Sequence, residues 1–184
     1  MRKLFWGFFL IFLDFKLSFG ISTLHLLPNW LGYAILAAGC SQLEKESELF
    51  EKARIFCLTL AGVNLFVWLG DLVGFTWGNN VPGIISQGMT PALFCLRLYV
   101  IRIIINAIAQ TEVRRNYDLS AAHLRRIWVA ITVSFAASLL FMWLPILSAI
   151  AAVAASIAGI IFLFAFHGTR KSYEQMLADY AQGF

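Results

Sequence analysis

The feature that most constrains this chain is a series of long apolar blocks separated by short polar strips. A helix needs about 20 apolar residues to cross a hydrocarbon core of about 30 Å, because each residue advances the helix by about 1.5 Å. The chain is 60% hydrophobic and 13% charged, whereas a soluble domain is roughly 45–50% apolar and about 25% charged. We therefore predict an all-α integral membrane protein, a polytopic bundle of six transmembrane helices that forms a single domain over residues 1–184. The predicted spans are residues 4–20, 28–43, 55–75, 91–110, 127–143 and 146–166.

The distribution of basic residues predicts how this bundle is oriented. Eleven of the fourteen Lys and Arg residues lie in strips on one side of the predicted spans. Cytoplasmic loops carry such an excess of positive charge, so we expect both termini in the cytoplasm and the six spans arranged as three helical hairpins. The residues on the cytoplasmic side are Arg2, Lys3, Lys45, Lys52, Arg54, Arg114, Arg115, Arg125, Arg126, Arg170 and Lys171.

Two polar strips on this side have the pattern of amphipathic helices. Residues 42–54 place Glu48 and Lys52 four positions apart, where opposite charges on a helix meet. In residues 172–184, Ser172 fits the start of a capping box and apolar residues follow at helical spacing. We expect two short cytoplasmic helices, which either bind a membrane-protein partner or anionic lipid, or lie solvated at the interface.

Four charged side chains fall at predicted membrane depth, where an ionisable group is costly and is a candidate functional residue. Counted at helical rise, Asp71 and Arg97 lie in the outer leaflet, and Asp14 and Arg102 lie near mid-depth. We predict a buried network in which Asp71 binds Arg97, Asp14 is a second acceptor, and Arg102 turns toward Asn106 or the bundle interior. The network either staples two spans together or binds a ligand.

A pocket is predicted on the outer side, beneath a loop rich in Gly, Asn, Ser and Thr at residues 78–90. Such a segment folds back to membrane depth where it lines a cavity, although a plain extracellular loop is the alternative. Aromatic walls with few polar groups are typical of small-molecule sites. The residues expected to line the pocket are His25, Asn29, Trp30, Tyr33 and Trp77.

Glycines recur at multiples of four residues in the third span and in the segment that follows it. Small residues at this spacing let a neighbouring helix approach closely, so we expect tight packing against this face. The glycines are Gly62, Gly70, Gly74 and Gly78.

No catalytic or metal-binding pattern accompanies these features. The three cysteines and three histidines are isolated from one another in the sequence, which predicts packing roles and no metal site. The H-E-x-x-H, G-x-S-x-G and Walker A patterns are missing. We therefore expect no cofactor, no enzymatic activity and no nucleic-acid partner.

The opening LFWGFFLIFLDF, followed by LPNWLGYAI, resembles small multi-pass membrane proteins of Gram-positive bacteria that carry no assigned activity. This resemblance implies a bacterial plasma membrane. Six spans in 184 residues are also similar in size and topology to the substrate-binding S-components of energy-coupling-factor transporters. The alanine-x-x-x-alanine pattern with which those proteins meet their partner is absent from residues 4–20.

These observations favour a small-molecule binding or transport component with an outward-facing pocket. A non-catalytic membrane module for sensing, immunity or partner assembly is the alternative, and a membrane enzyme that acts on lipid headgroups is a third reading.

Overall fold

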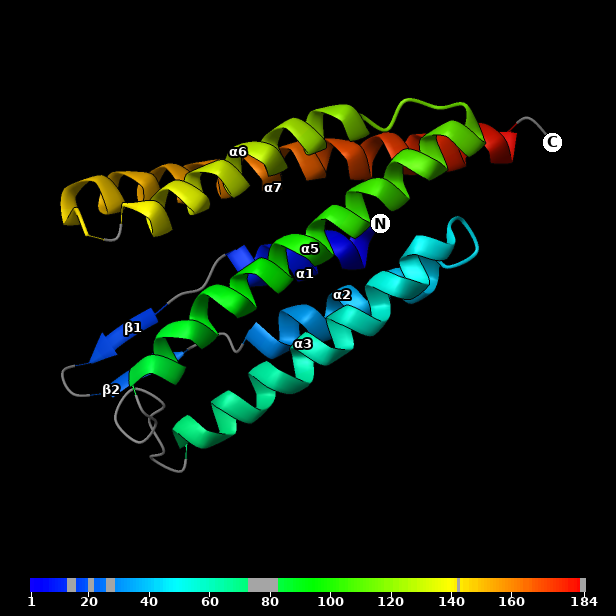
Figure 1. The fold of residues 1–184 in the computed structure, drawn as a ribbon. Coiled ribbons are helices and arrows are strands. Elements are labelled where there is room, and N and C mark those ends of the chain that lie inside the picture. The colour runs from blue at the N-terminus through cyan, green and yellow to red at the C-terminus, as the bar shows by residue number, and fades with distance from the viewer. Residues whose placement is uncertain (13–15, 20–21, 26–28, 73–82, 142, 183–184) are drawn as a thin grey trace. The chain divides into compact units, whose positions relative to one another are not determined.

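The computed structural model describes residues 1–12, 16–19, 22–25, 29–72, 83–141 and 143–182. For residues 16–19, 22–25, 71–72, 83–90, 145 and 182 it describes the backbone alone. The contacts divide the chain into two compact units, Arg2–Ile103 and Ile104–Phe184, with the boundary inside one long helix. In chain order the elements are α1 (Arg2–Phe12), β1 (Lys16–Phe19), β2 (Ser22–His25), α2 (Asn29–Leu43), α3 (Glu48–Leu72), α5 (Gly83–Arg115), α6 (Ala121–Leu140) and α7 (Pro145–Gln182) (Figure 1).

The prediction of a helical membrane protein is confirmed for the last four apolar blocks. The segments Glu48–Gly70, Pro91–Arg115, Ala121–Leu140 and Ile146–Ala181 are long and apolar enough to cross a membrane. Large apolar side chains remain exposed along them, which suits helices whose outer faces contact lipid. Among the exposed side chains are Leu58, Phe66, Val133, Leu140, Ile150, Ile157 and Phe164.

The first predicted span, residues 4–20, is wrong at residues 16–19, which form a strand, while residues 13–15 and 20 lie outside the described residues. With 11 residues, α1 is only about 16 Å long, and the chain then forms an antiparallel pair of strands, β1 and β2, with Lys16 opposite His25. Gly20 disfavours a helix at this point, and the β-branched Thr23 favours a strand. The second predicted span is also short, because α2 has 15 residues and measures about 22 Å.

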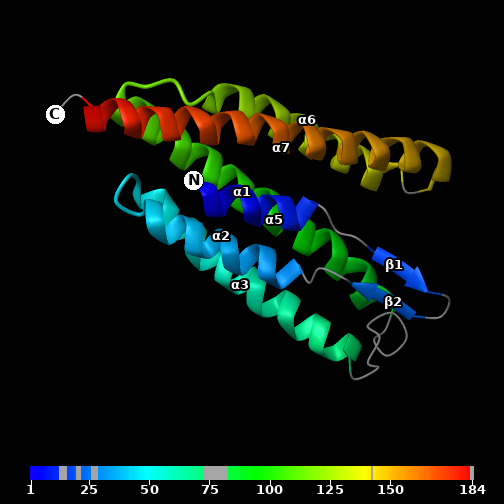
Figure 2. The same cartoon turned by 180° about the vertical axis from the view of Figure 1, so that it is seen from behind.

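Glycine brings α1 and α2 into close antiparallel contact (Figures 1 and 2). At each contact a glycine faces a larger residue of the other helix, and a Cβ added to the glycine would lie 2.6–2.8 Å from that residue's side chain. Residues 4, 7 and 11 of α1 meet residues 39, 36 and 32 of α2, and the two series run in opposite directions. The contacts are Leu4 with Gly39, Gly7 with Leu36, and Ile11 with Gly32.

The expectation of close packing at Gly62 is wrong, because no atom lies within 4 Å of the place where its Cβ would be. The glycines that admit a neighbouring helix are instead Gly7 on α1 and, seven residues apart on α2, Gly32 and Gly39. A seven-residue spacing keeps both on one helix face as well as a four-residue spacing does. Gly62 itself is exposed on the surface of α3.

The strip at residues 42–54 is not a separate cytoplasmic helix. It forms the end of α2, a tight turn and the first turns of α3, where the Ser47 Oγ accepts a hydrogen bond from the Leu49 N–H at 3.2 Å. Serine stabilises the start of a helix in this way. Phe50 and Ala53, on the predicted apolar face, are completely buried.

The strip at residues 172–184 is helical up to Gln182, but it is the continuation of α7 and not a separate helix. The Arg170 Nε donates to the Glu174 Oε1 at 3.0 Å, an i,i+4 pair that crosses the expected break and supports an unbroken helix. Tyr173 and Met176 are buried, as the predicted apolar face requires. With 38 residues, α7 is about 57 Å long.

In the second unit α6 packs along α7, and the two helices lie side by side in both views (Figure 2). Near their connection, the Ser148 Oγ donates to the Ser138 carbonyl at 3.3 Å. Toward the end of α7, the Tyr180 hydroxyl donates to the Arg115 carbonyl at 3.1 Å, and the Arg115 guanidinium lies 5.6 Å from the Tyr180 ring centroid. These contacts tie both ends of α7 to the rest of the unit.

Candidate functional site

Arg97 of α5 reaches the end of α1. Its Nη2 donates to the Ile11 carbonyl oxygen at 2.8 Å, and its Cζ lies 4.8 Å from the Phe12 ring centroid and 5.9 Å from that of Phe94. The last four carbonyls of a helix have no partner within the helix and form the negative end of its dipole. Arg97 therefore caps α1 with a charge-assisted hydrogen bond, and this contact offsets part of the cost of a guanidinium at membrane depth.

The predicted partners of Arg97 fall outside the part of the chain that can be described at side-chain level. Asp14 lies outside the described residues, and Asp71, near the end of α3, is described by its backbone alone. Their pairing with Arg97 stays a prediction. Arg102 is exposed, and five residues after Arg97 it lies about 140° away around the helix. Its orientation toward Asn106 or the bundle interior stays a prediction. Asn64, a polar residue in the middle of α3, donates to the Leu60 carbonyl of its own helix at 2.8 Å.

Three of the five predicted pocket residues lie together in the first five residues of α2. Tyr33 is buried, and Asn29 and Trp30 are half-buried. The Asn29 Oδ1 and the Trp30 Nε1 are themselves buried, and neither has a hydrogen-bond partner among the described residues. His25 belongs to β2, whose side chains are not described, and Trp77 lies outside the described residues.

An aromatic wall stands beside these two polar atoms. The Trp30 ring centroid lies 6.3 Å from that of Trp68 on α3, with 57° between the ring planes. Trp68 was not among the predicted pocket residues, because by position it lies inside a span. Its distance from Trp30 depends on how α2 and α3 pair, which a single sequence does not reveal.

Ile11 connects the Arg97 contact with the start of α2. Its carbonyl accepts the bond from Arg97, while its side chain fills the space beside Gly32. Gly32 directly precedes Tyr33 and follows Trp30 by two residues. The Arg97 contact and the two buried polar atoms thus both lie near the start of α2. The polar atoms of Asn29 and Trp30, beside the rings of Trp30 and Trp68, are of the kind that bind a small molecule with a hydrogen-bonding edge and an apolar body.

Cys40 and Cys57, which are far apart in the sequence and were predicted to have packing roles, lie together in the structure. Both are completely buried, one on α2 and the other on the facing α3, and their thiols interact with each other. Neighbouring positions across a helix pair cannot be recognised without the register of the two helices. The two thiols belong to the packed interior of the first unit.

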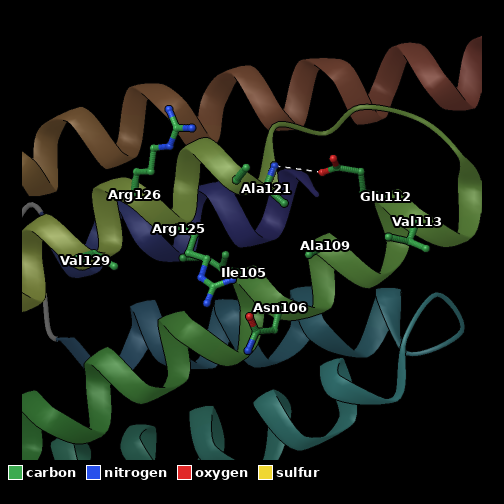
Figure 3. Close-up of a pocket in the computed structure, with 10 residues that line it drawn as sticks. Ile105, Asn106, Ala109, Glu112, Val113, Ala121, Arg125, Arg126 and Val129 are labelled. Carbon is green, nitrogen blue, oxygen red and sulfur yellow. Dashed lines mark hydrogen bonds between the residues drawn. The ribbon is translucent and has the colours of Figure 1, made fainter.

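The second unit contains a hollow of about 590 Å³ between the last turns of α5 and the first turns of α6 (Figure 3). Its walls are mainly apolar, and its polar side chains are Asn106, Glu112, Arg125 and Arg126. In the predicted topology this place is the cytoplasmic side, whereas the predicted pocket faces outward. In the sequence, Arg125 and Arg126 indicate only the orientation of the chain in the membrane.

Among the described residues no group of three or more His, Cys, Asp and Glu side chains could hold a metal ion. Comparison of the chain with protein-family models, with curated proteins and with solved structures finds no match.

Proposed function

We propose that the chain is a multi-pass protein of a bacterial plasma membrane that binds a small molecule, or helps to transport one, through an outward-facing pocket. The proposed pocket consists of Asn29, Trp30 and Tyr33 of α2 with Trp68 of α3, and the sequence adds His25 and Trp77 as predicted wall residues. Arg97, with Asp14 and Asp71 as its acidic partners, closes this end of the first unit.

The proposal includes six membrane-embedded helices arranged as three hairpins. Because α1 and α2 are antiparallel, α2 returns the chain to the side from which α1 entered. The predicted topology is therefore retained even though both helices are short. Four long helices then cross the membrane in turn, which brings the C-terminus back to the side of the N-terminus. The basic strips support the cytoplasm as that side.

The observation that carries the proposed ligand site is the pair of buried polar atoms, the Asn29 Oδ1 and the Trp30 Nε1. A buried donor or acceptor left without a partner costs about 1–3 kcal/mol. A ligand that donates one hydrogen bond and accepts another would remove both penalties. The rings of Trp30 and Trp68 supply the apolar contact that such a site needs.

Purification of the full chain from its native membrane, followed by mass spectrometry of the small molecules released on denaturation, tests this function. We expect one small molecule at near-stoichiometric amount in the unmodified chain. Trp30→Phe keeps the ring but removes the N–H donor, so the amount of bound molecule should fall.

Thermal unfolding of the purified chain after the ligand has been dialysed away supplies the control. Without ligand, Trp30→Phe removes a buried donor that has no partner among the described residues, so it should leave the melting temperature unchanged or raise it. A chain that carries no small molecule, together with a Trp30→Phe variant that is destabilised in the same ligand-free state, contradicts the proposed pocket.

A partner-assembly module is the second candidate function, and the length of α7 favours it. A helix of 38 residues exceeds a hydrocarbon core of about 30 Å by roughly 27 Å. The excess forms a helical extension that ends with the exposed Leu177 and Tyr180. A protein that co-purifies with the full chain and is lost on deletion of residues 177–184, with no bound small molecule, would support this function over the first.

A further inference from the structure

One hydrogen bond among the residues that line the hollow of the second unit joins α5 to the start of α6 (Figure 3). The Glu112 Oε2 accepts from the Ala121 backbone N–H at 3.1 Å. Ala121 is the first residue of α6, and the preceding Ser120 makes no side-chain cap to that helix. Glu112 therefore does the work of the missing cap, and its negative charge faces the positive end of the α6 dipole.

Asn106 and Arg125 face each other across this hollow. Figure 3 shows Arg125 extending from α6 toward Ile105 and Asn106 on α5, whereas Arg126 is directed away from them. All three polar side chains, Asn106, Arg125 and Arg126, are exposed. The apolar wall beside them is formed by Ile105, Ala109, Val113 and Val129.

Arg125 and Arg126 differ from the other arginines of the chain. Of nine arginines, the other seven engage a carboxylate, a carbonyl, a ring or another group. Among the described residues the structure gives Arg125 and Arg126 neither a hydrogen bond nor an ion pair. A guanidinium beside an amide and an apolar wall, without an acidic partner, is a place for an anion that has an apolar part.

We infer that this hollow binds an anionic phospholipid, with its phosphate held by Arg125 and Asn106 and an acyl chain lying along Ile105 and Val129. Arginine binds phosphate through two parallel N–H donors, and the Asn106 amide can donate to the phosphate while its oxygen accepts from a headgroup hydroxyl. Glu112 opposes an anion, but its carboxylate is turned to the start of α6. Arg126 adds a second positive charge at the rim.

Two features favour a lipid over a soluble phosphate: the predicted position of the hollow at the membrane surface and its apolar lining. The basic strips place the hollow where α5 and α6 leave the cytoplasmic leaflet, and that leaflet carries anionic lipids. A soluble phosphate would gain nothing from the aliphatic surface of Ile105, Val113 and Val129. The inference uses the proposed topology, but it is independent of the proposed small-molecule pocket in the first unit.

Native mass spectrometry of the full chain in a neutral detergent, titrated with phosphatidylglycerol or phosphatidylcholine, tests the inference. We expect phosphatidylglycerol to bind more tightly, and Arg125→Gln to raise its apparent Kd about fivefold, the effect of one basic residue near an anionic surface. Arg125→Lys should raise the apparent Kd for phosphatidylglycerol less than Arg125→Gln does, because an ammonium keeps the charge but lacks the paired donors. Asn106→Leu should weaken the binding of phosphatidylglycerol more than that of phosphatidylcholine, because both lipids lose a donor to the phosphate and only phosphatidylglycerol also loses the acceptor for a headgroup hydroxyl.

Arg114→Gln is the matched control, because it removes one positive charge on the same predicted side from an exposed residue that does not line the hollow. Its binding should equal that of the unmodified chain, and glycerol phosphate should not displace the lipid. Equal loss in Arg114→Gln and Arg125→Gln would show diffuse attraction and overturn the site. Equal binding of the two lipids, or displacement by glycerol phosphate, would overturn it as well. Neither result bears on the small-molecule pocket proposed for the first unit, which is tested separately.

Discussion

The glycine contact between α1 and α2 makes a sharp prediction for Gly39→Ala. A Cβ on Gly39 would lie 2.8 Å from the Leu4 Cδ2 and 2.9 Å from the Leu4 backbone nitrogen. The side chain can turn aside, but the nitrogen moves only if the whole of α1 moves. Separations this short cannot persist, so the substitution must push the two helices apart.

The size of the effect comes from two opposing terms. Overpacking a well-packed core costs about 1–3 kcal/mol, and replacing glycine by alanine inside a helix returns about 1 kcal/mol. Gly62→Ala is the matched control, because its new Cβ meets no atom within 4 Å and only the favourable term remains. The two variants should therefore differ by about 1–3 kcal/mol in free energy of unfolding.

Thermal unfolding of both variants in the same detergent measures this difference. For a chain of 184 residues, about 2–4 °C of melting temperature corresponds to 1 kcal/mol. Gly62→Ala should melt at or above the unmodified protein, and Gly39→Ala clearly below Gly62→Ala. Identical melting temperatures for the two variants would refute the close approach of α1 and α2.

Two further predictions concern side chains that hold helix ends. Arg97→Gln removes the charged cap of α1 and should cost about 1.5–3 kcal/mol, the worth of a hydrogen bond to a charged group, measured by thermal unfolding. If Asp71 also binds Arg97, Asp71→Asn alone should be worse than the double variant, because it strands a buried charge; purely additive losses would mean that the two do not meet. Glu112→Ala should cost about 0.5–2 kcal/mol through the loss of the α6 cap, and hydrogen exchange at Ala121 should rise, whereas unchanged exchange there would contradict the role of Glu112.

Much of the helical framework could be predicted because long apolar blocks report directly on helices that lie in lipid. The blocks at residues 55–75, 91–110, 127–143 and 146–166 overlap α3, α5, α6 and α7. However, α5 begins at Gly83, so residues 83–90 are helical where a loop was predicted. The first block was wrongly predicted as one span, because the length of an apolar block does not reveal that its second half pairs as a strand with residues 22–25. Apolar composition alone does not distinguish a strand from a short helix.

The sequence predicts those parts of the candidate site whose residues are neighbours on one helix. It does not predict contacts that depend on how two helices pair. Asn29, Trp30 and Tyr33 lie close together because they are close in sequence on one helix. Trp68 joins Trp30 only through the register of α2 with α3. The cap that Arg97 places on α1 joins residues 86 positions apart, so the sequence showed an unexplained arginine but not its acceptor.

The most direct test of the central claim is labelling of intact cells with a membrane-impermeant thiol reagent. The native Cys95, which is exposed, is first replaced by alanine, while Cys40 and Cys57 are buried. Single cysteines are then placed at Asn79 in the predicted outer loop and at Ser172 on α7. The proposed topology predicts that the cysteine at Asn79 is labelled and that the cysteine at Ser172 is labelled only after the cells are opened. Labelling of Ser172→Cys from outside, with Asn79→Cys protected, would contradict an outward-facing pocket in this protein.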